Sequence, residues 1–89
     1  WTFDQIATGT IPPSWSVGST RPNGPNATWE VIEDATAPSS KQVLALVRTN
    51  HSSGGTFNLC WTDSVAFLDG AISVRFKAQS GNEDQGGGI

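Results

Sequence analysis

AISVRFKA, residues 71–78, carries the clearest fold signal in this sequence. Apolar and polar side chains alternate along it without a break. The apolar members are Ile72, Val74, Phe76 and Ala78, and the polar members are Ser73, Arg75 and Lys77. Successive side chains of a β-strand point to opposite faces, so the alternation predicts a strand with one buried and one solvated face.

Three further segments fit the same interpretation. TFNLCWT (56–62) predicts a second alternating strand with Phe57, Leu59 and Trp61 facing inward. TWEVIED (28–34) predicts a third, whose core side chains are Trp29 and Val31. KQVLALVR (41–48) is apolar on both faces, which is typical of a more central strand.

Short segments rich in turn-forming residues separate these strands. They are RPNGPN (21–26), APSS (37–40), NHSSGG (50–55) and LDGA (68–71). The Asp69-Gly70 pair is suited to a two-residue hairpin between VAFL (65–68) and AISV (71–74). Since no segment shows a helical period with a capping signal, we predict an all-β, antiparallel fold, a sandwich rather than a barrel.

The composition limits both size and partners. The 89 residues form one domain at most, and the four Trp and four Phe dominate its small core. The net charge of −3 and five scattered basic residues give no patch that could neutralise phosphates, which argues against nucleic acid. The longest apolar run, VLALV (43–47), is too short to span a bilayer. Cys60 is the single cysteine, so we expect a small buried hydrophobe and neither a disulfide nor a cysteine-based metal site.

The order of landmarks along the chain resembles the N-terminal half of concanavalin A-like jelly-roll domains. It runs from WTFDQIATGTIPPSW (1–15) through TWEVIED, APSSKQVLAL (37–46), TFNLCW (56–61) and AISVRFKAQSG (71–81) to EDQGGGI (83–89). The pattern is similar to that of bacterial secreted domains of unknown function related to 3-keto-disaccharide hydrolase, laminin G-like and glucanase sandwiches. The resemblance implies a secreted or periplasmic protein whose concave sheet face recognises carbohydrate.

The resemblance also implies that QGGGI (85–89) is an inner strand normally followed by further strands; the alternative interpretation is that GGGI (86–89) is a disordered tail. We therefore expect residues 1–89 to be either a single domain or the N-terminal part of one β-sandwich. The Trp at position 1 suggests removal of the natural start, by signal-peptide cleavage or because the chain belongs to something longer. An open sheet edge near Gly86–Ile89 would pair with the remaining strands of its own protein or with a second chain.

No catalytic constellation is apparent in the sequence. The acids of the pairs Glu33-Asp34 and Glu83-Asp84 are adjacent, so a strand would point them to opposite faces, unlike paired glycosidase carboxylates. We interpret both pairs as solvated turn acids. His51 is the single histidine and lies in a predicted loop without companion metal ligands, so we predict no metal or cofactor. It is interpreted as a solvated residue, with a sugar contact or a general base as alternatives.

Candidate ligand-binding residues follow from strand parity. Asn58, with Ser73, Arg75 and Lys77, would line one wet sheet face if the two alternating strands pair. Arg75 could donate two hydrogen bonds to vicinal hydroxyls or to a carboxylate. Trp15 follows a stiff Pro-Pro pair and would either seal the sandwich edge or offer its indole face to a sugar.

These observations give three alternative functions. The first is carbohydrate recognition without catalysis, by Asn58, Arg75, Lys77, Trp15 and His51. The second is part of a glycoside hydrolase or lyase whose catalytic groups lie in a missing C-terminal half. The third is a structural or interaction module that recruits another chain through an exposed sheet edge.

Overall fold

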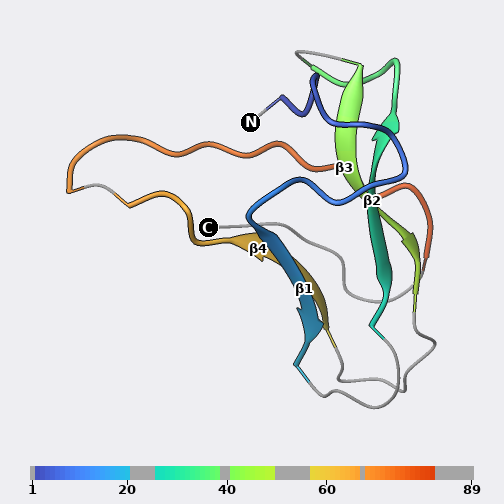
Figure 1. Ribbon diagram of the computed structural model, residues 1–89. Coiled ribbons are helices and arrows are strands. Elements are labelled where there is room, and N and C mark those ends of the chain that lie inside the picture. Colours follow the sequence, from blue (N-terminus) through green and yellow to red (C-terminus); the bar gives the residue numbers. More distant parts are fainter. Residues whose placement is uncertain (1, 21–25, 39–40, 50–56, 67, 82–89) are drawn as a thin grey trace.

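The fold is all-β. The computed structural model describes the chain except at residues 1, 21–25, 39–40, 50–56, 67 and 82–89. The described residues contain no helix and four strands: β1 (Trp15–Ser19), β2 (Thr28–Glu33), β3 (Gln42–Arg48) and β4 (Asn58–Thr62). They pair as two antiparallel sheets, β1–β4 and β2–β3 (Figure 1). The prediction of an antiparallel all-β fold is confirmed at this level, whereas the stretch 83–89 lies outside the described residues.

The β2–β3 sheet joins two strands that are neighbours in sequence. Val31 lies opposite Leu44, and the register shifts once, between Thr28 and Trp29. Both strands were predicted from their hydrophobic patterns and both form. Within the described residues, however, β3 has a hydrogen-bonded neighbour on one side only, so the central position predicted for it is not seen there.

The N-terminal segment supplies backbone partners on the other side of β2. The Gly9 amide donates to the Val31 carbonyl at 2.9 Å, and the Val31 amide donates to the Thr10 carbonyl at 2.8 Å. Val31 is therefore enclosed on both sides and is 0% exposed. Its predicted core position is confirmed, while Trp29, two residues earlier, is half-buried. Apart from Val31, the buried apolar residues among those described are Pro12 and Ala27.

In the β1–β4 sheet, the two faces are reversed relative to the sequence prediction. Asn58, Cys60 and Thr62 are half-buried on the face they share with Ser19, Val17 and Trp15. Phe57, Leu59 and Trp61 are exposed, so their predicted inward orientation is wrong. Hydrophobicity identified the alternation correctly, but the side chains on the more apolar side of β4 are 41–50% exposed.

Residues 71–78 do not form the predicted strand. None of them has a ladder partner among the described segments, and all are exposed. The apolar row Ile72, Val74 and Phe76 was expected in the core and lies on the surface, so this prediction is also wrong. The physical reason is that alternation favours an extended backbone, but a strand also needs hydrogen bonds from a neighbour.

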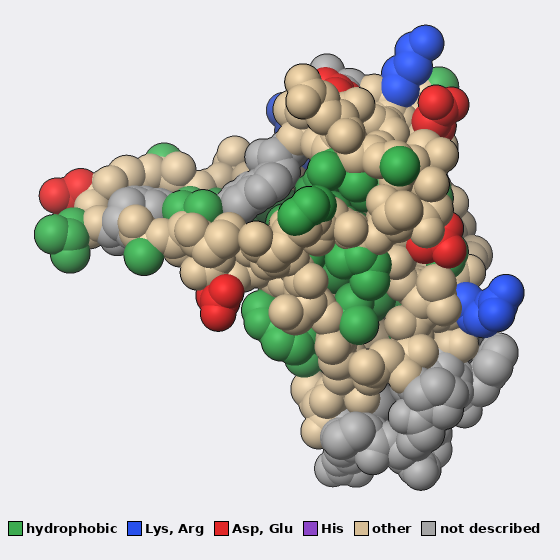
Figure 2. Space-filling view, viewed as in Figure 1, with side chains coloured by type: hydrophobic (Ala, Val, Ile, Leu, Met, Phe, Trp, Pro, Cys, Tyr) green, Lys and Arg blue, Asp and Glu red, His purple; other side chains and the backbone are tan. Residues whose placement is uncertain are grey.

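The predicted turn at Asp69-Gly70 is only partly realised. Figure 1 shows the chain leaving β4, extending away from the sheets, turning back on itself and returning towards the β2–β3 sheet. The residues before and after the turn form no ladder, so the hairpin predicted at Asp69-Gly70 does not form among the described residues. We call residues 63–66 and 68–76 the arm. Figure 2 shows the arm extending away from the body of the molecule.

Candidate functional site

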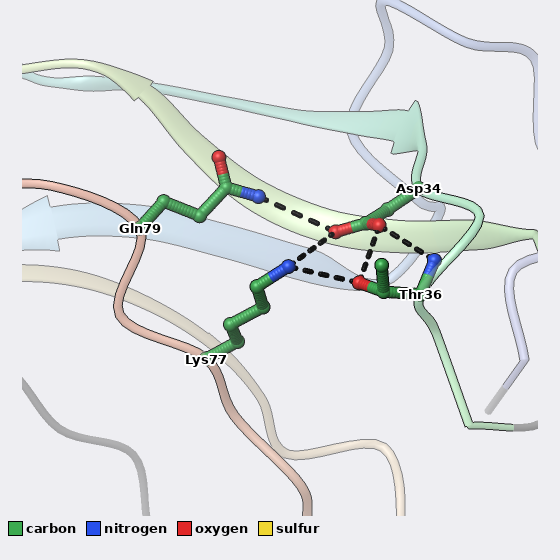
Figure 3. A network of polar contacts seen from close by, with 4 residues as sticks. All are labelled: Asp34, Thr36, Lys77 and Gln79. Atoms are coloured by element: carbon green, nitrogen blue, oxygen red, sulfur yellow. Dashed lines mark hydrogen bonds and ion pairs between the residues drawn. The ribbon is translucent and has the colours of Figure 1, made fainter.

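The most connected polar group in the described chain lies where the end of β2 meets the segment that follows the arm. Lys77 Nζ donates to Thr36 Oγ1 at 2.8 Å and lies 3.8 Å from Asp34 Oδ2 (Figure 3). Gln79 Nε2 donates to the same carboxylate oxygen at 3.3 Å. Two segments separated by more than forty residues are thereby joined through one carboxylate.

Local backbone geometry positions Asp34. Its amide continues the β2–β3 ladder by donating to the Lys41 carbonyl at 2.6 Å, which fixes the residue immediately after β2. Its Oδ1 then accepts the Thr36 amide at 2.8 Å and the Thr36 hydroxyl at 2.7 Å. An aspartate that accepts the amide two residues later forms an Asx-turn, which turn-forming sequences favour. The carboxylate is therefore oriented before Lys77 or Gln79 reaches it.

Hydrogen bonding, more than ion pairing, sets the charge state of this site. The Thr36 hydroxyl, followed by the Thr36 amide, lowers the pKa of Asp34 below its ordinary value, with smaller contributions from Lys77 and Gln79. Partial desolvation acts in the opposite direction. The Asp34 side chain is 15% exposed, but that of Lys77 is 58% exposed, so water and salt screen their attraction.

An open hollow adjoins this network. Its lining consists of Ile32, Glu33, Asp34, Ala35, Lys77, Ala78 and Gln79. Carboxylate, ammonium and amide groups thus meet beside a small apolar floor. Within the described residues, no group of three or more potential metal ligands lies close enough together to hold an ion. The polar side chains that line the hollow can donate and accept hydrogen bonds.

The structure separates the residues predicted to share one binding face. Lys77 belongs to the hollow, whereas Arg75 is exposed and has no hydrogen bond or ion pair to any described residue. Because β4 pairs with β1, the sheet face expected to combine Asn58 with Arg75 and Lys77 does not form. The Asn58 Oδ1 atom is instead buried, with no hydrogen-bond partner in the described chain.

The two remaining candidates have different outcomes. Trp15 begins β1 and is half-buried, with its ring 5.8 Å from that of Phe3 in an edge-to-face contact. This geometry places Trp15 at the junction between the N-terminal segment and β1. His51 lies outside the described residues.

Sequence reasoning missed three members of the polar network, namely Asp34, Thr36 and Gln79. Asp34 was interpreted as a solvated turn acid, yet it is the acceptor on which the group converges. The Asp-Ala-Thr stretch at 34–36 was a usable signal, since Asp followed two residues later by Thr is suited to an Asx-turn. Nothing in the sequence indicated that Lys77 and Gln79 would approach it.

No protein-family model matches this chain, and neither a curated protein nor a solved structure shows significant similarity to it. No helix occurs in the described residues, and hence none there that could cross a membrane.

Proposed function

We propose that this chain is a carbohydrate-recognition module of the concanavalin A-like sandwich type and that the polar hollow binds sugar hydroxyls. The observation that carries the proposal is the convergence of Asp34, Lys77 and Gln79 on one open surface. The same proposal places the protein outside the cytoplasm, in a secreted or periplasmic setting that cell fractionation can test.

A sugar can bind in the hollow only if the lining residues have hydrogen-bond donors and acceptors that their contacts with Asp34 and Thr36 do not already use. Lys77 carries three donors and makes one hydrogen bond to the described residues, to Thr36, so it retains donors for a ligand. The Gln79 amide donates through its nitrogen to Asp34, and its oxygen is left to accept. The exposed carboxylate of Glu33 adds a second acceptor beside the hollow. Each sugar hydroxyl both donates and accepts, so this combination suits a vicinal pair.

Lys77 and Arg75 provide a matched test, because they carry the same charge two residues apart and only Lys77 lines the hollow. The protein should bind at least one member of a panel of neutral and acidic glycans. Lys77→Ala should weaken that binding about tenfold or more, since a charged hydrogen bond contributes about 1.5–3 kcal/mol. Arg75→Ala should change it little. Titration calorimetry, with melting temperatures to check folding, measures both.

Two outcomes would overturn the proposal. The first is a protein that binds no glycan on the panel. The second is an equal loss of glycan binding in the Arg75→Ala and Lys77→Ala variants, because a ligand held in the hollow should distinguish the two residues.

A further inference from the structure

Two apolar rows of equal length lie uncovered on this molecule. The first, row A, consists of Phe57, Leu59 and Trp61, at and within β4. The second, row B, consists of Ile72, Val74 and Phe76, on the arm. Their members are between 41% and 64% exposed. Figure 2 shows hydrophobic side chains on the visible surface over the β1–β4 sheet and along the arm. Exposed apolar groups of this extent mark interaction sites.

We propose that two copies of this chain exchange arms, so that row B of each copy packs on row A of the other. Both rows repeat every second residue, which gives the same spacing of about 6.6 Å between successive side chains in extended backbone. The three side chains of row B in one copy can therefore lie opposite the three side chains of row A in the other. Because each copy offers one row of each kind, the arrangement is self-complementary, as a two-fold dimer requires.

The arm is held at its base in a way that leaves row B free. Lys77 and Gln79 contact Asp34 and share one parity of the extended chain, while Ile72, Val74 and Phe76 have the other parity. On the receiving side, the ring of Trp61 packs over Gly18. A β-carbon added to Gly18 would lie 3.3 Å from two of its ring atoms. Row A therefore ends in an aromatic surface held against the backbone of β1.

The exposed area matches what a stable dimer needs. From typical side-chain areas and the exposed fractions, rows A and B together present about 450 Å² of apolar surface per chain. Reciprocal burial in two copies would remove about 900 Å² of apolar area. Because interface cores are about 65% apolar, this corresponds to roughly 1,400 Å² in total, within the range of about 1,200–2,000 Å² for stable complexes.

The test uses one substitution in each row, Leu59→Glu in row A and Val74→Lys in row B. Both side chains are exposed, so each variant should keep its fold by circular dichroism. The sedimentation coefficient of the unmodified protein should rise with concentration to that of a dimer. Either variant alone should associate at least about tenfold more weakly, because both contacts of the dimer then contain a buried unpaired charge.

Mixing the two variants shows whether a second copy of this chain is the partner that covers rows A and B. In a mixed pair, one contact keeps the original side chains and the other brings the introduced lysine of one copy against the introduced glutamate of the second, so association should return. If the arm closed on its own chain, or if a different protein were the partner, mixing would restore nothing. Arg75→Glu, on the opposite side of the arm, is the control and should leave association unchanged. A monomer at all concentrations, association that ignores both substitutions, or failure of mixing would overturn the exchange.

Discussion

The β2–β3 sheet and the region formed by β4 and the arm have similar hydrophobic patterns, but they differ in whether the apolar side chains become buried. Val31 in β2 is fully buried, whereas Val74 in the arm is 52% exposed. The difference lies in the backbone: β2 has hydrogen-bonded partners on both sides, β3 on one and Gly9-Thr10 on the other. Residues 68–76 of the arm have no backbone partner in the described chain. An alternating pattern thus marks which side chains can be buried together, and the neighbouring segments decide whether they are.

The largest effect should come from truncating the same side chain in both regions. Val31→Ala should lower the free energy of unfolding by about 2 kcal/mol, because it opens a cavity at a fully enclosed position. Val74→Ala should lower it by less than about 0.5 kcal/mol, since that side chain is half in water already. Denaturant titration of dilute protein measures both. Equal losses would show that the arm is packed and would remove the contrast between the regions.

A second effect tests the segment that encloses β2. Gly9 has a φ of 83°, a backbone region that side chains other than glycine enter with strain. Gly9→Ala should therefore cost about 1 kcal/mol of unfolding free energy. The cause is the backbone rather than crowding, because an added β-carbon would meet nothing closer than Glu30 at 4.0 Å. Gly9→Asn should cost less, since Asn tolerates this conformation better. If both variants have the same unfolding free energy as the unmodified protein, the positive φ at Gly9 is not required for stability.

A third effect concerns pH at the junction between the two regions. Since folding lowers the pKa of Asp34, the stability it contributes is fully present above its unfolded-state pKa and is lost as the pH falls through the lower folded value. Thr36→Val should raise the pKa of Asp34, because it removes the hydroxyl that contributes most. Lys77→Ala should raise it less. Carboxyl NMR titration measures both shifts, and Thr62→Val, which removes a hydroxyl elsewhere, should leave the pKa unchanged. If Lys77→Ala raised the pKa of Asp34 more than Thr36→Val does, the ion pair with Lys77 would be the main influence on this carboxylate, and the hydrogen bonds from Thr36 would be secondary.

The smallest effect concerns Cys60 on the inner face of β4. Burial raises the pKa of its thiol, so little reactive thiolate exists at neutral pH. Alkylation by iodoacetamide should be slower than that of a free thiol. Val17→Ala, which trims the residue opposite Cys60, should accelerate it severalfold, whereas Ser16→Ala on the other face should not. Fast labelling of the unmodified protein would contradict the assignment of this face as the inner one.

Local sequence patterns predicted three of the four described strands, but they also predicted a strand at 71–78 that does not form. The TWEVIED, KQVLALVR and TFNLCWT segments all contain the strands that their alternation or apolar character indicated. β1 was missed, because WSVGS has a glycine and two serines and little β-forming character apart from Trp15 and Val17. The choice of inner face on β4 could not be read from the side chains, since it depends on what lies opposite.

The candidate site shows the same limit. Lys77 was identified because it is a charged residue on a predicted strand, but strand parity paired it with Asn58. Its partners proved to be Asp34 and Thr36, which the turn after β2 presents. The turn is a local feature that the Asp-Ala-Thr stretch encodes. The meeting of that turn with residues 77–79 depends on the path of the arm, which no local pattern specifies.

The nesting of one strand pair inside the other has a consequence for how the molecule assembles and opens. The connection between β2 and β3 runs only from residue 34 to 41, whereas that between β1 and β4 runs from 20 to 57 and contains the whole β2–β3 sheet. Since each doubling of loop length costs about 0.6 kcal/mol of closure entropy, the outer pair costs roughly 1.3 kcal/mol more to close. The inner hairpin should therefore form first. The amide protons of β1 and β4 should exchange with solvent through local opening, while those of Gly9 and Val31, which donate to the carbonyls of Val31 and Thr10, remain protected.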